Sequence, residues 1–427
     1  MLNYVNRLTK SGFVRNVAIV ATGTAGAQAI AIAFAPIITR MYGPEVFGSM
    51  GTFIAILEII SPFAALSYPI AMVLPKNDSD AIALGKLSLS IALFTSLITA
   101  MILALFKEPI VNTFNLQMIE PYLILLPLTM FFSVSMAVAG QWTIRKKLFK
   151  LKARAAILQS LLVNTAKSGL GIINPTAIIL IGMTSLGYLI HTLLLWAGIK
   201  LANKETTYPD EHQYLPQNKY KLFEQLKIYK EFAYFRTPQI FLSSIGQSLP
   251  ILMLANLFTP AAVGFYILAR TVLFVPSNLI GSSVADVFYP KFVETIRNGD
   301  SGKNLLLKSC ISLASVGAVP YITLIVCGPW LFSLIFGADW KEAGEYARWM
   351  SIWLFLVLIT RPIIAAIPAL SLQGLFLLFE GTALLVRAAA IMVGYFWIGT
   401  ALSAVIAFSL SNLIIYAVLT IIVIKKA

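Results

Sequence analysis

The chain has 427 residues, of which 59% are hydrophobic and only 12% are charged, and its formal net charge is +14. Soluble domains average about 25% charged residues, so this composition, with a mean hydropathy of +0.84, predicts an all-α polytopic membrane protein. The two cysteines and two histidines argue against a disulfide framework, a metal site and a Ser/His catalytic site.

Apolar runs recur along the chain, and each is close to or longer than the roughly 20 residues that cross a bilayer as a helix. They predict twelve spans, at residues 17–38, 47–74, 84–106, 121–143, 155–174, 176–199, 233–257, 264–288, 308–336, 346–369, 375–396 and 400–424. Two spans carry interruptions, since Lys167, Gly169 and Gly171 break the fifth and Pro329 breaks the ninth. The polar start, residues 1–16, precedes a run too long for a signal peptide, so we expect an uncleaved first span.

The positive charges are distributed unevenly between the segments that connect these spans. With the N-terminus inside, the cytoplasmic segments hold 23 of the 32 lysines and arginines and the outer loops hold four. Basic residues favour the cytoplasmic side of a membrane, so we predict that both termini lie in the cytoplasm. The same distribution accounts for the basic net charge, and no nucleic-acid partner is expected.

A long polar segment, residues 200–231, divides the apolar chain into two similar parts. It predicts an N-terminal six-helix lobe at 1–200, a cytoplasmic linker at 201–231 and a C-terminal six-helix lobe at 232–427. Within the linker, residues 220–232 place Leu222, Phe223, Leu226 and Tyr229 at helical spacing, with lysines opposite. The pattern fits a basic amphipathic helix on an anionic membrane face, or a solvated linker helix.

Two short motifs repeat at corresponding places in the two parts. Tyr42–Gly48 and Phe258–Gly264 both read aromatic, spacer, proline, two residues, hydrophobic and then glycine within two. Each motif is followed at about the same distance by Pro-Lys, at 75–76 and at 290–291. Because six spans separate the copies, both parts enter the membrane in the same sense. The duplication therefore predicts a pseudo-two-fold axis along the membrane normal, with a cavity between the halves.

Charged side chains inside the predicted spans are the first candidates for a functional site, because such residues are costly in lipid and usually face a cavity or a partner. Four cations lie at depth, Lys167, Arg270, Arg361 and Arg387, against two acids, Glu58 and Glu380. A cavity lined by these cations attracts anions, and arginine binds phosphate through a bidentate fork. The alternative is structural pairing, for example of Glu58 with an arginine of a neighbouring helix.

Glu380 and Arg387 are seven residues apart on one helical face, which separates them by about 10 Å along the axis. We therefore expect them to line one stripe without bonding each other. Uncharged polar residues line two further faces, Gln239, Ser243 and Gln247 in the seventh span and Gln159, Asn164 and Ser168 in the fifth. Such residues hydrogen-bond sugars, and they also join helices to each other. The sequence contains no Gly-rich phosphate loop, HExxH or GxSxG, so no enzyme is predicted.

Several stretches of the sequence resemble the Wzx-type polysaccharide flippases of the MATE/MOP exporter superfamily. They are Ile38–Gly48, Ile70–Lys76, Gln141–Phe149, Tyr229–Phe232, Arg236–Pro238, Ala262–Tyr266 and Phe336–Gly344. The resemblance implies two six-helix lobes related by a parallel pseudo-two-fold axis around a cationic cavity. It implies transfer of undecaprenyl-diphosphate-linked oligosaccharide, such as an O-antigen or lipopolysaccharide unit, from the cytoplasmic to the periplasmic leaflet of a bacterial inner membrane by alternating access.

The resemblance also suggests roles for individual residues. The lumen cations of the family map best onto Arg270, then onto Lys167, Arg361 and Arg387. The remaining candidates follow from residue type and position in the predicted spans: Gln239 and Gln247 are expected to bind the glycan. Glu58 and Glu380 are the candidates for coupling or gating. No cofactor is expected beyond coupling to a proton or sodium gradient or to the membrane potential. Expected partners are the lipid-linked glycan, membrane lipids, a polysaccharide polymerase and a chain-length regulator.

Two other functions remain open. A MATE-type cation-coupled drug or metabolite antiporter has the same fold, but such proteins commonly carry acids in the first lobe, where this chain has Glu58 alone at depth and no acid in its first span. A membrane glycan polymerase or ligase is the alternative from another class. Such enzymes tend to carry large external loops, which this chain lacks.

Overall fold

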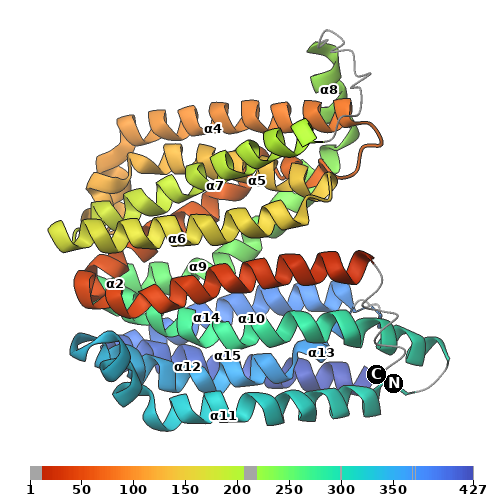
Figure 1. Cartoon of the computed structure of the whole chain (residues 1–427). Helices are drawn as coiled ribbons and strands as arrows, with labels where there is room; N and C mark the ends of the chain where they lie inside the picture. Colours follow the sequence, from red (N-terminus) through yellow and green to blue (C-terminus); the bar gives the residue numbers. More distant parts are fainter. Residues whose placement is uncertain (1–11, 206–218, 299–300, 368, 371, 427) are drawn as a thin grey trace. The chain divides into compact units, whose positions relative to one another are not determined.

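The computed structural model describes residues 12–205, 219–298, 301–367, 369–370 and 372–426 (Figure 1). Arg7 and Lys10, counted above among the cytoplasmic charges, lie outside these residues, as does the central part of the polar linker, 206–218. The described residues form helices and turns without a strand. Nine of their helices are long and apolar enough to cross a membrane. The prediction of an all-α polytopic membrane protein is confirmed.

Most predicted spans lie mainly in one helix. Two are divided: a turn at residues 66–67 interrupts the second span, 47–74, and a break at Thr360 interrupts the tenth, 346–369. The helices are α2 (Gly12–Ala65), α3 (Tyr68–Ala71), α4 (Asp78–Thr113), α5 (Leu125–Arg145), α6 (Phe149–Ile173), α7 (Ala177–Glu205), α8 (Lys219–Ile228), α9 (Thr237–Leu257), α10 (Pro260–Arg297), α11 (Lys303–Phe336), α12 (Lys341–Ile359), α13 (Arg361–Ala366), α14 (Gln373–Trp397) and α15 (Ala401–Lys426). Short 3-10 turns precede α5 and α12, and a π-helical turn, Phe232–Arg236, leads into α9. Helix α8 begins within a residue of the amphipathic helix predicted in the linker.

The first predicted span and the second as far as Ala65 lie in α2, which bends at Gly43. Gly43 has φ 69° and ψ 170°, a conformation outside the helical region. A glycine adopts positive φ without the steric penalty of a side chain, and Pro44 then fits the first turn of the second helical part. The Gly-Pro pair therefore separates the two spans while the chain stays helical on either side.

The two predicted interruptions are wrong. Helix α6 continues through Lys167, Gly169 and Gly171, and α11 continues through Pro320 and Pro329. In a membrane the backbone groups must satisfy one another, which favours an unbroken helix and makes glycine and proline tolerable inside it. Lys167 stays within α6 because its ammonium finds a hydrogen-bond partner on the next helix.

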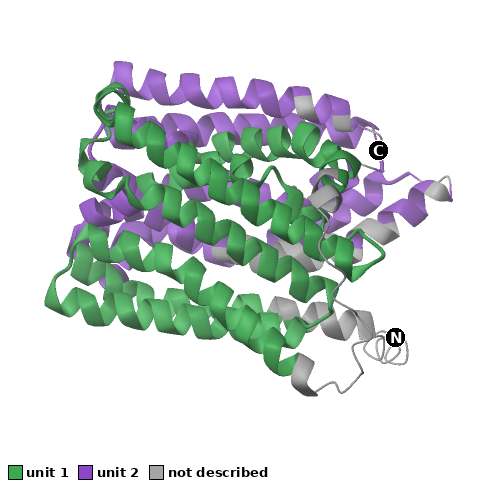
Figure 2. Cartoon of the chain, turned by 90° about the horizontal axis from the view of Figure 1, so that it is seen from above, with its two compact units in different colours: residues 1–42, 52–248 green, residues 43–51, 249–427 purple. Residues whose placement is uncertain are grey.

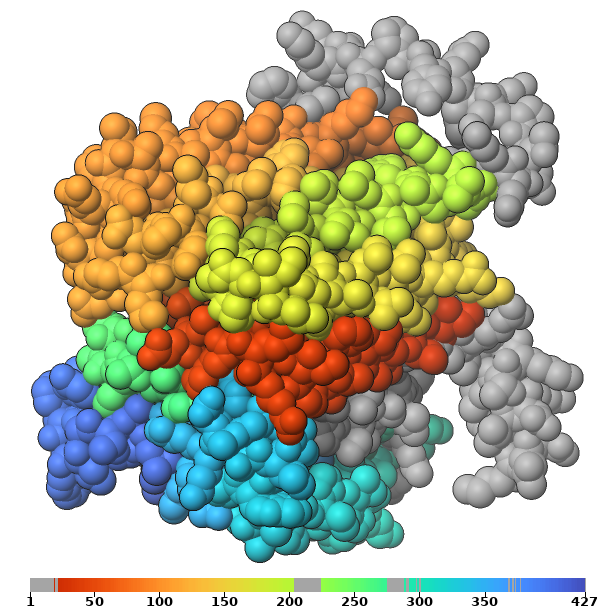
Figure 3. Space-filling model, turned by 60° about the vertical axis from the view of Figure 1, so that its left-hand side comes forward, coloured from red at the N-terminus to blue at the C-terminus, as the bar shows by residue number. Residues whose placement is uncertain are grey.

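The described chain forms two compact units (Figure 2). Unit 1 comprises Met1–Tyr42 and Thr52–Ser248, and unit 2 comprises Gly43–Gly51 and Leu249–Ala427. In unit 1, α5 and α7 pack together, α4 packs on α5, and α6 packs on α7 (Figure 1). The first part of α2 lies along α6, as the red and yellow surfaces in Figure 3 show, and Ser160 of α6 donates a hydrogen bond to the Ala27 carbonyl.

A polar clasp at one end of unit 1 joins two of the stretches that carry the family resemblance. Arg145, at the end of α5, donates from Nε to Asp78 Oδ1 at 2.8 Å and from a terminal nitrogen to the Pro75 carbonyl at 2.7 Å. Lys146 pairs with the other oxygen of Asp78. The rigid fork of an arginine suits several acceptors at once, so the clasp fixes the turn between α3 and α4 against α5.

Unit 2 is built around α12, which packs against α10, α11 and α15. Its buried core includes Phe288, Phe292, Leu306, Ile363 and Leu419. At the start of α12, Trp340 is 1% exposed and its ring meets those of Phe47 and Phe265 edge-on, at centroid distances of 5.2 Å and 6.1 Å. Residues of both repeated motifs or their immediate continuation thus pack on the same tryptophan.

The two copies of the repeated motif face each other within unit 2. A Cβ atom added to Gly48 would collide with the Pro260 carbonyl, and one added to Gly264 would collide with the Pro44 carbonyl. The contact is reciprocal: the glycine of each motif receives the proline carbonyl of the other. A two-fold relation between the copies produces such an arrangement. Each copy needs a glycine here because a Cβ atom would occupy the place of the proline carbonyl.

Alanine at Gly48 or Gly264 is therefore expected to destabilise the protein, by about 1–3 kcal/mol for overpacking of a filled site. Thermal unfolding of the purified protein in detergent measures the effect as a lower midpoint. Gly140→Ala is the matched control, because a Cβ atom there meets no other atom within 4 Å. Equal midpoints for all three variants would contradict the proposed need for close contact.

Candidate functional site

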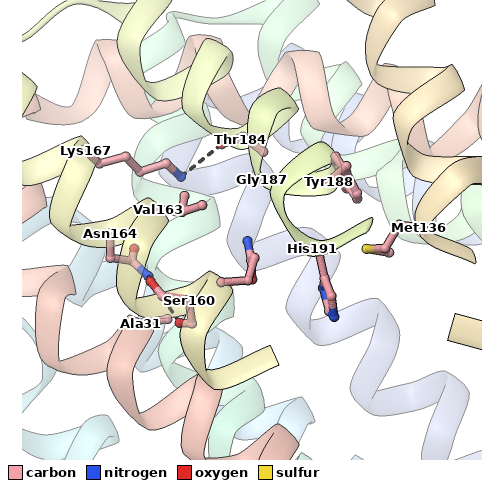
Figure 4. A pocket seen from close by; sticks show the side chains of 11 residues that line it. Ala31, Met136, Ser160, Val163, Asn164, Lys167, Thr184, Gly187, Tyr188 and His191 are labelled. Carbon is pink, nitrogen blue, oxygen red and sulfur yellow. Dashed lines mark hydrogen bonds between the residues drawn. The ribbon is translucent and has the colours of Figure 1, made fainter. Parts of the chain in front are cut away.

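A polar cavity lies inside unit 1, with a volume of about 330 Å³ (Figure 4). Helices α6 and α7 form its two main walls, and α2 and α5 contribute one residue each. The lining residues are Ala31, Met136, Gln159, Ser160, Val163, Asn164, Lys167, Thr184, Gly187, Tyr188 and His191. On both main helices these residues recur three or four positions apart, which places them on one helical face. We call this space the lysine cavity.

Lys167 supplies the positive charge of the lysine cavity. Its ammonium donates a hydrogen bond to the Thr184 hydroxyl at 2.9 Å, from α6 to α7 (Figure 4). The Tyr42 hydroxyl donates to the Lys167 backbone carbonyl at 2.7 Å, which holds this turn of α6 against α2. No carboxylate among the described residues forms an ion pair with Lys167. The cavity lining contains no acid.

The rest of the lysine cavity offers neutral hydrogen-bonding groups. Asn164 donates from its amide to the Ser160 carbonyl at 2.7 Å and keeps its oxygen as an acceptor. His191 Nε2 is buried and has no hydrogen-bond partner in the described part of the chain. Buried polar atoms are nearly always paired, so this ring nitrogen is available as a hydrogen-bonding group in the cavity wall.

A second cavity of unit 1, about 340 Å³, contains Glu58. Four serines, Ser61, Ser67, Ser133 and Ser244, also line it, and Tyr188 lines both cavities. Glu58 accepts a hydrogen bond from Ser248 at 3.4 Å, and no arginine pairs with it in the described ranges. The predicted alternative, pairing with an arginine, is therefore not seen there. We call this space the glutamate cavity.

Unit 2 holds the other four charged candidates. Arg387 of α14 is 8% exposed and donates from Nε to Asn412 Oδ1 of α15 at 2.9 Å. It also pairs with Glu380, with 3.6 Å between nitrogen and oxygen. The expectation that Glu380 and Arg387 do not bond is therefore wrong. Two helical turns separate their backbones, but the two long side chains extend toward each other and close the gap.

Arg361 and Arg270 lie near this ion pair. Arg361, Arg387 and Glu380 are all within electrostatic range of the Tyr416 hydroxyl, and Arg270 and Arg387 are within range of the Tyr266 hydroxyl. Arg361 begins α13, and its Nε is buried without a hydrogen-bond partner among the described residues. Arg270 stacks over the Phe274 ring at 5.4 Å. We call Arg270, Arg361 and Arg387 with Glu380 the arginine cluster.

The two predicted glutamines lie outside both cavities of unit 1. Gln239 accepts a hydrogen bond from Arg236 at 2.8 Å, and Gln247 donates to Ser243 at 3.4 Å. Both side chains are exposed. Their role in glycan binding stays a prediction.

The structure thus gathers three predicted arginines and Glu380 in unit 2, and it places Lys167 and Glu58 in separate cavities of unit 1. Sequence reasoning missed Thr184, Tyr188 and His191 as cavity residues. They are four and three residues apart along the sixth predicted span, so they share one helical face. This spacing could have identified them as a polar face. It also missed Asn412, the partner of Arg387. No group of three or more metal-binding side chains occurs among the described residues.

Comparison with known proteins gives a family and a fold. The family model described as "Polysaccharide biosynthesis protein" matches residues 37–345. No curated protein matches the chain. Each solved structure compared below shares no more than 14% of its residues with the chain, so these likenesses concern the fold.

Three solved structures illustrate the fold. One is an inward-facing multidrug resistance MATE family transporter of the MOP superfamily, with a TM-score of 0.69 and 14% identity over 94% of this chain and 96% of that one. Another is the lipid II flippase MurJ in an inward closed conformation, with a TM-score of 0.69 and 13% identity over 96% of this chain and 87% of that one. A third is a MOP superfamily transporter from Pyrococcus furiosus, with a TM-score of 0.57 and 14% identity over 96% of this chain and 94% of that one. The MATE-like fold expected from the sequence is confirmed.

Proposed function

The chain belongs to the polysaccharide biosynthesis protein family, and on this basis we propose that it is a flippase for undecaprenyl-diphosphate-linked oligosaccharide. The family and the fold together support a transporter of the MOP type. The substrate is our proposal, and the arginine cluster carries it. Arginine forks bind phosphates through two parallel hydrogen bonds, and the buried Nε of Arg361, which has no partner among the described residues, leaves a donor for such a ligand.

In this proposal the arginine cluster receives the diphosphate while the prenyl tail stays in lipid. Export by alternating access from the cytoplasmic to the periplasmic leaflet of a bacterial inner membrane would then be aided by the membrane potential. Moving one charge is worth about 2.3 kcal/mol per 100 mV, so a headgroup of roughly two negative charges leaving a cell about 150 mV negative inside gains about 7 kcal/mol. That energy supports export without an obligatory counter-ion.

Reconstitution tests this function directly. Proteoliposomes carrying a radiolabelled undecaprenyl-diphosphate glycan on one leaflet should show protein-dependent transfer to the other leaflet, read by the access of a glycan-cleaving enzyme. Cationic drugs should be neither transported nor able to compete. Drug-coupled cation exchange without glycan transfer would favour the antiporter alternative, and glycan elongation or ligation would favour the enzyme.

The proposed orientation predicts the sides of two positions. In a background with Cys310 and Cys327 replaced by serine, Lys219→Cys and Lys341→Cys are expected to label from opposite sides. Lys219 precedes α9 in the predicted cytoplasmic linker, whereas Lys341 begins α12 in a predicted outer loop. An impermeant maleimide added to intact cells should modify position 341 and spare 219 until the cells are opened. Labelling of both positions from one side would contradict the twelve-span arrangement.

Glu58 is the better candidate for a coupling group, because Glu380 is committed to Arg387 while Glu58 faces a serine-lined cavity. We expect Glu58→Gln to slow transport and to flatten its dependence on pH, since an amide cannot exchange a proton. The measurement is the rate of glycan transfer across a series of pH values. Glu108→Gln, at an exposed position of α4, is the matched control. An unchanged pH profile in Glu58→Gln would assign this acid a structural role.

A further inference from the structure

We propose that the lysine cavity binds one carboxylate-bearing sugar ring of the transported glycan, so that the protein selects an acidic repeat unit. The inference rests on the proposed flippase function and adds the chemical class of the glycan. It also gives Lys167 a role of its own: Lys167 binds the sugar carboxylate, and the diphosphate is left to the three arginines.

Size is the first reason. Small-molecule pockets measure about 300–1,000 Å³, so a cavity of about 330 Å³ holds a ligand at the small end of that range. Its polar residues extend from Gln159 to Lys167 on α6 and from Thr184 to His191, seven residues on, on α7. Seven residues of helix rise by about 10 Å, which accommodates a sugar ring together with a charged substituent. A whole oligosaccharide does not fit.

Charge is the second reason. The lining carries a single cation, Lys167, whose hydrogen-bond partner is the neutral Thr184 hydroxyl at 2.9 Å. A lone, half-buried ammonium is best balanced by one negative charge, which a carboxylate provides. A diphosphate brings more than one charge and favours guanidinium forks, and the lining has none. Those forks lie in the arginine cluster of unit 2.

The neutral groups of the cavity complete a sugar site. Gln159 and Asn164 offer amides that both donate and accept, which suits ring hydroxyls. Tyr188 adds an aromatic face for the apolar side of a sugar ring. His191 Nε2, which has no partner among the described residues, can form a further hydrogen bond. Gln159, Asn164, Lys167 and Tyr188 are half-buried, so a ligand can reach them.

The test uses three soluble probes on the purified full-length protein in nanodiscs: D-glucuronate, D-glucose and inorganic pyrophosphate. Isothermal titration or saturation-transfer NMR gives the apparent Kd of each. Glucuronate should bind wild-type protein at least about tenfold more tightly than glucose, as a charge-assisted hydrogen bond provides. Lys167→Met should remove that preference, and Lys167→Arg should keep part of it. Lys150→Met, an exposed lysine at the start of α6, should leave it unchanged.

A second variant guards against misfolding of Lys167→Met. Gln159→Ala keeps the charge and should weaken glucuronate and glucose binding alike. Equal affinity of wild-type protein for glucuronate and glucose, binding of neither, or full glucuronate binding by Lys167→Met would each overturn the inference.

Pyrophosphate distinguishes this inference from the flippase proposal. We expect pyrophosphate binding to survive Lys167→Met and to fall in Arg361→Ala. Pyrophosphate binding that requires Lys167 would overturn the acidic-sugar site and leave the flippase proposal standing. Glucuronate binding as expected, with pyrophosphate indifferent to Arg361→Ala, would support the sugar site and count against the proposed headgroup site.

Discussion

Arg361→Ala is expected to lower the rate of lipid-linked glycan transfer by about 10- to 100-fold, the range in which hydrogen bonds to charged groups fall. The reason is that Arg361 contributes a half-buried cation to the arginine cluster, and its Nε has no hydrogen-bond partner among the described residues, so it can bind the headgroup. The folded protein should remain nearly as stable as wild type, because the substitution breaks no hydrogen bond found in the described chain. Transfer in proteoliposomes and the thermal unfolding midpoint measure the two quantities separately.

Substitutions that keep or remove the positive charge test whether charge is the cause of this loss. Arg361→Lys and Arg270→Lys should keep partial transfer because they keep the charge, whereas Arg270→Ala should lose most of it. Lys341→Ala, an exposed cation of unit 2 outside the cluster, is the control and should transfer normally. Well-folded alanine variants at Arg270, Arg361 and Arg387 that transfer glycan at wild-type rates would show that the cluster is not the anion site.

Arg387→Ala is expected to lower the stability of the folded protein. Glu380 is 36% exposed, so the ion pair adds little, but loss of the buried guanidinium leaves the Asn412 oxygen without its donor, which typically costs about 1–3 kcal/mol. In the wild-type chain the guanidinium lies 3.6 Å from a Glu380 carboxylate oxygen and 2.9 Å from the Asn412 side-chain oxygen. The substitution leaves both oxygens without this partner. The variant should show a sharply lower unfolding midpoint and a reduced yield in the membrane.

A double substitution separates folding from binding at this position. Arg387→Met with Glu380→Gln removes both charges and keeps apolar volume in the cluster, so the unfolding midpoint should recover much of its loss. Glycan transfer should stay low, because the cation is absent. Recovery of transfer together with stability would assign Arg387 to the scaffold alone. Glu380→Gln by itself is the control for the loss of the acid.

Much of the fold could be read from the sequence because the membrane imposes simple rules on length and polarity. The apolar runs located most of the helices, and the repeated motif Tyr42–Gly48 lies where α2 bends. The errors came from treating local signals as decisive. Lys167 and Pro329 looked like breaks, but a partner such as Thr184 lies on another helix and is invisible to a local reading. Likewise, a backbone spacing cannot show that the side chains of Glu380 and Arg387 meet.

The candidate site was predictable in part for the same reason. Charges inside spans are rare, so Lys167, Glu58 and the three arginines stood out at once. Which of them gather depends on how each helix is rotated about its axis and on which helices are neighbours. Neither quantity can be read from one sequence. Tyr188, which lines both cavities of unit 1, became a candidate only through that three-dimensional arrangement.

The central claim is that this protein moves a lipid-linked glycan across the membrane, and a strain lacking it tests that claim most directly. The measurement is the amount of undecaprenyl-diphosphate-linked oligosaccharide in the inner leaflet of the cytoplasmic membrane, compared with the parent strain and with the strain carrying the gene again. We expect completed repeat units to accumulate in the inner leaflet, and the restored wild-type chain, but not Arg361→Ala, to clear them. A normal inner-leaflet pool with normal polysaccharide at the surface would contradict it.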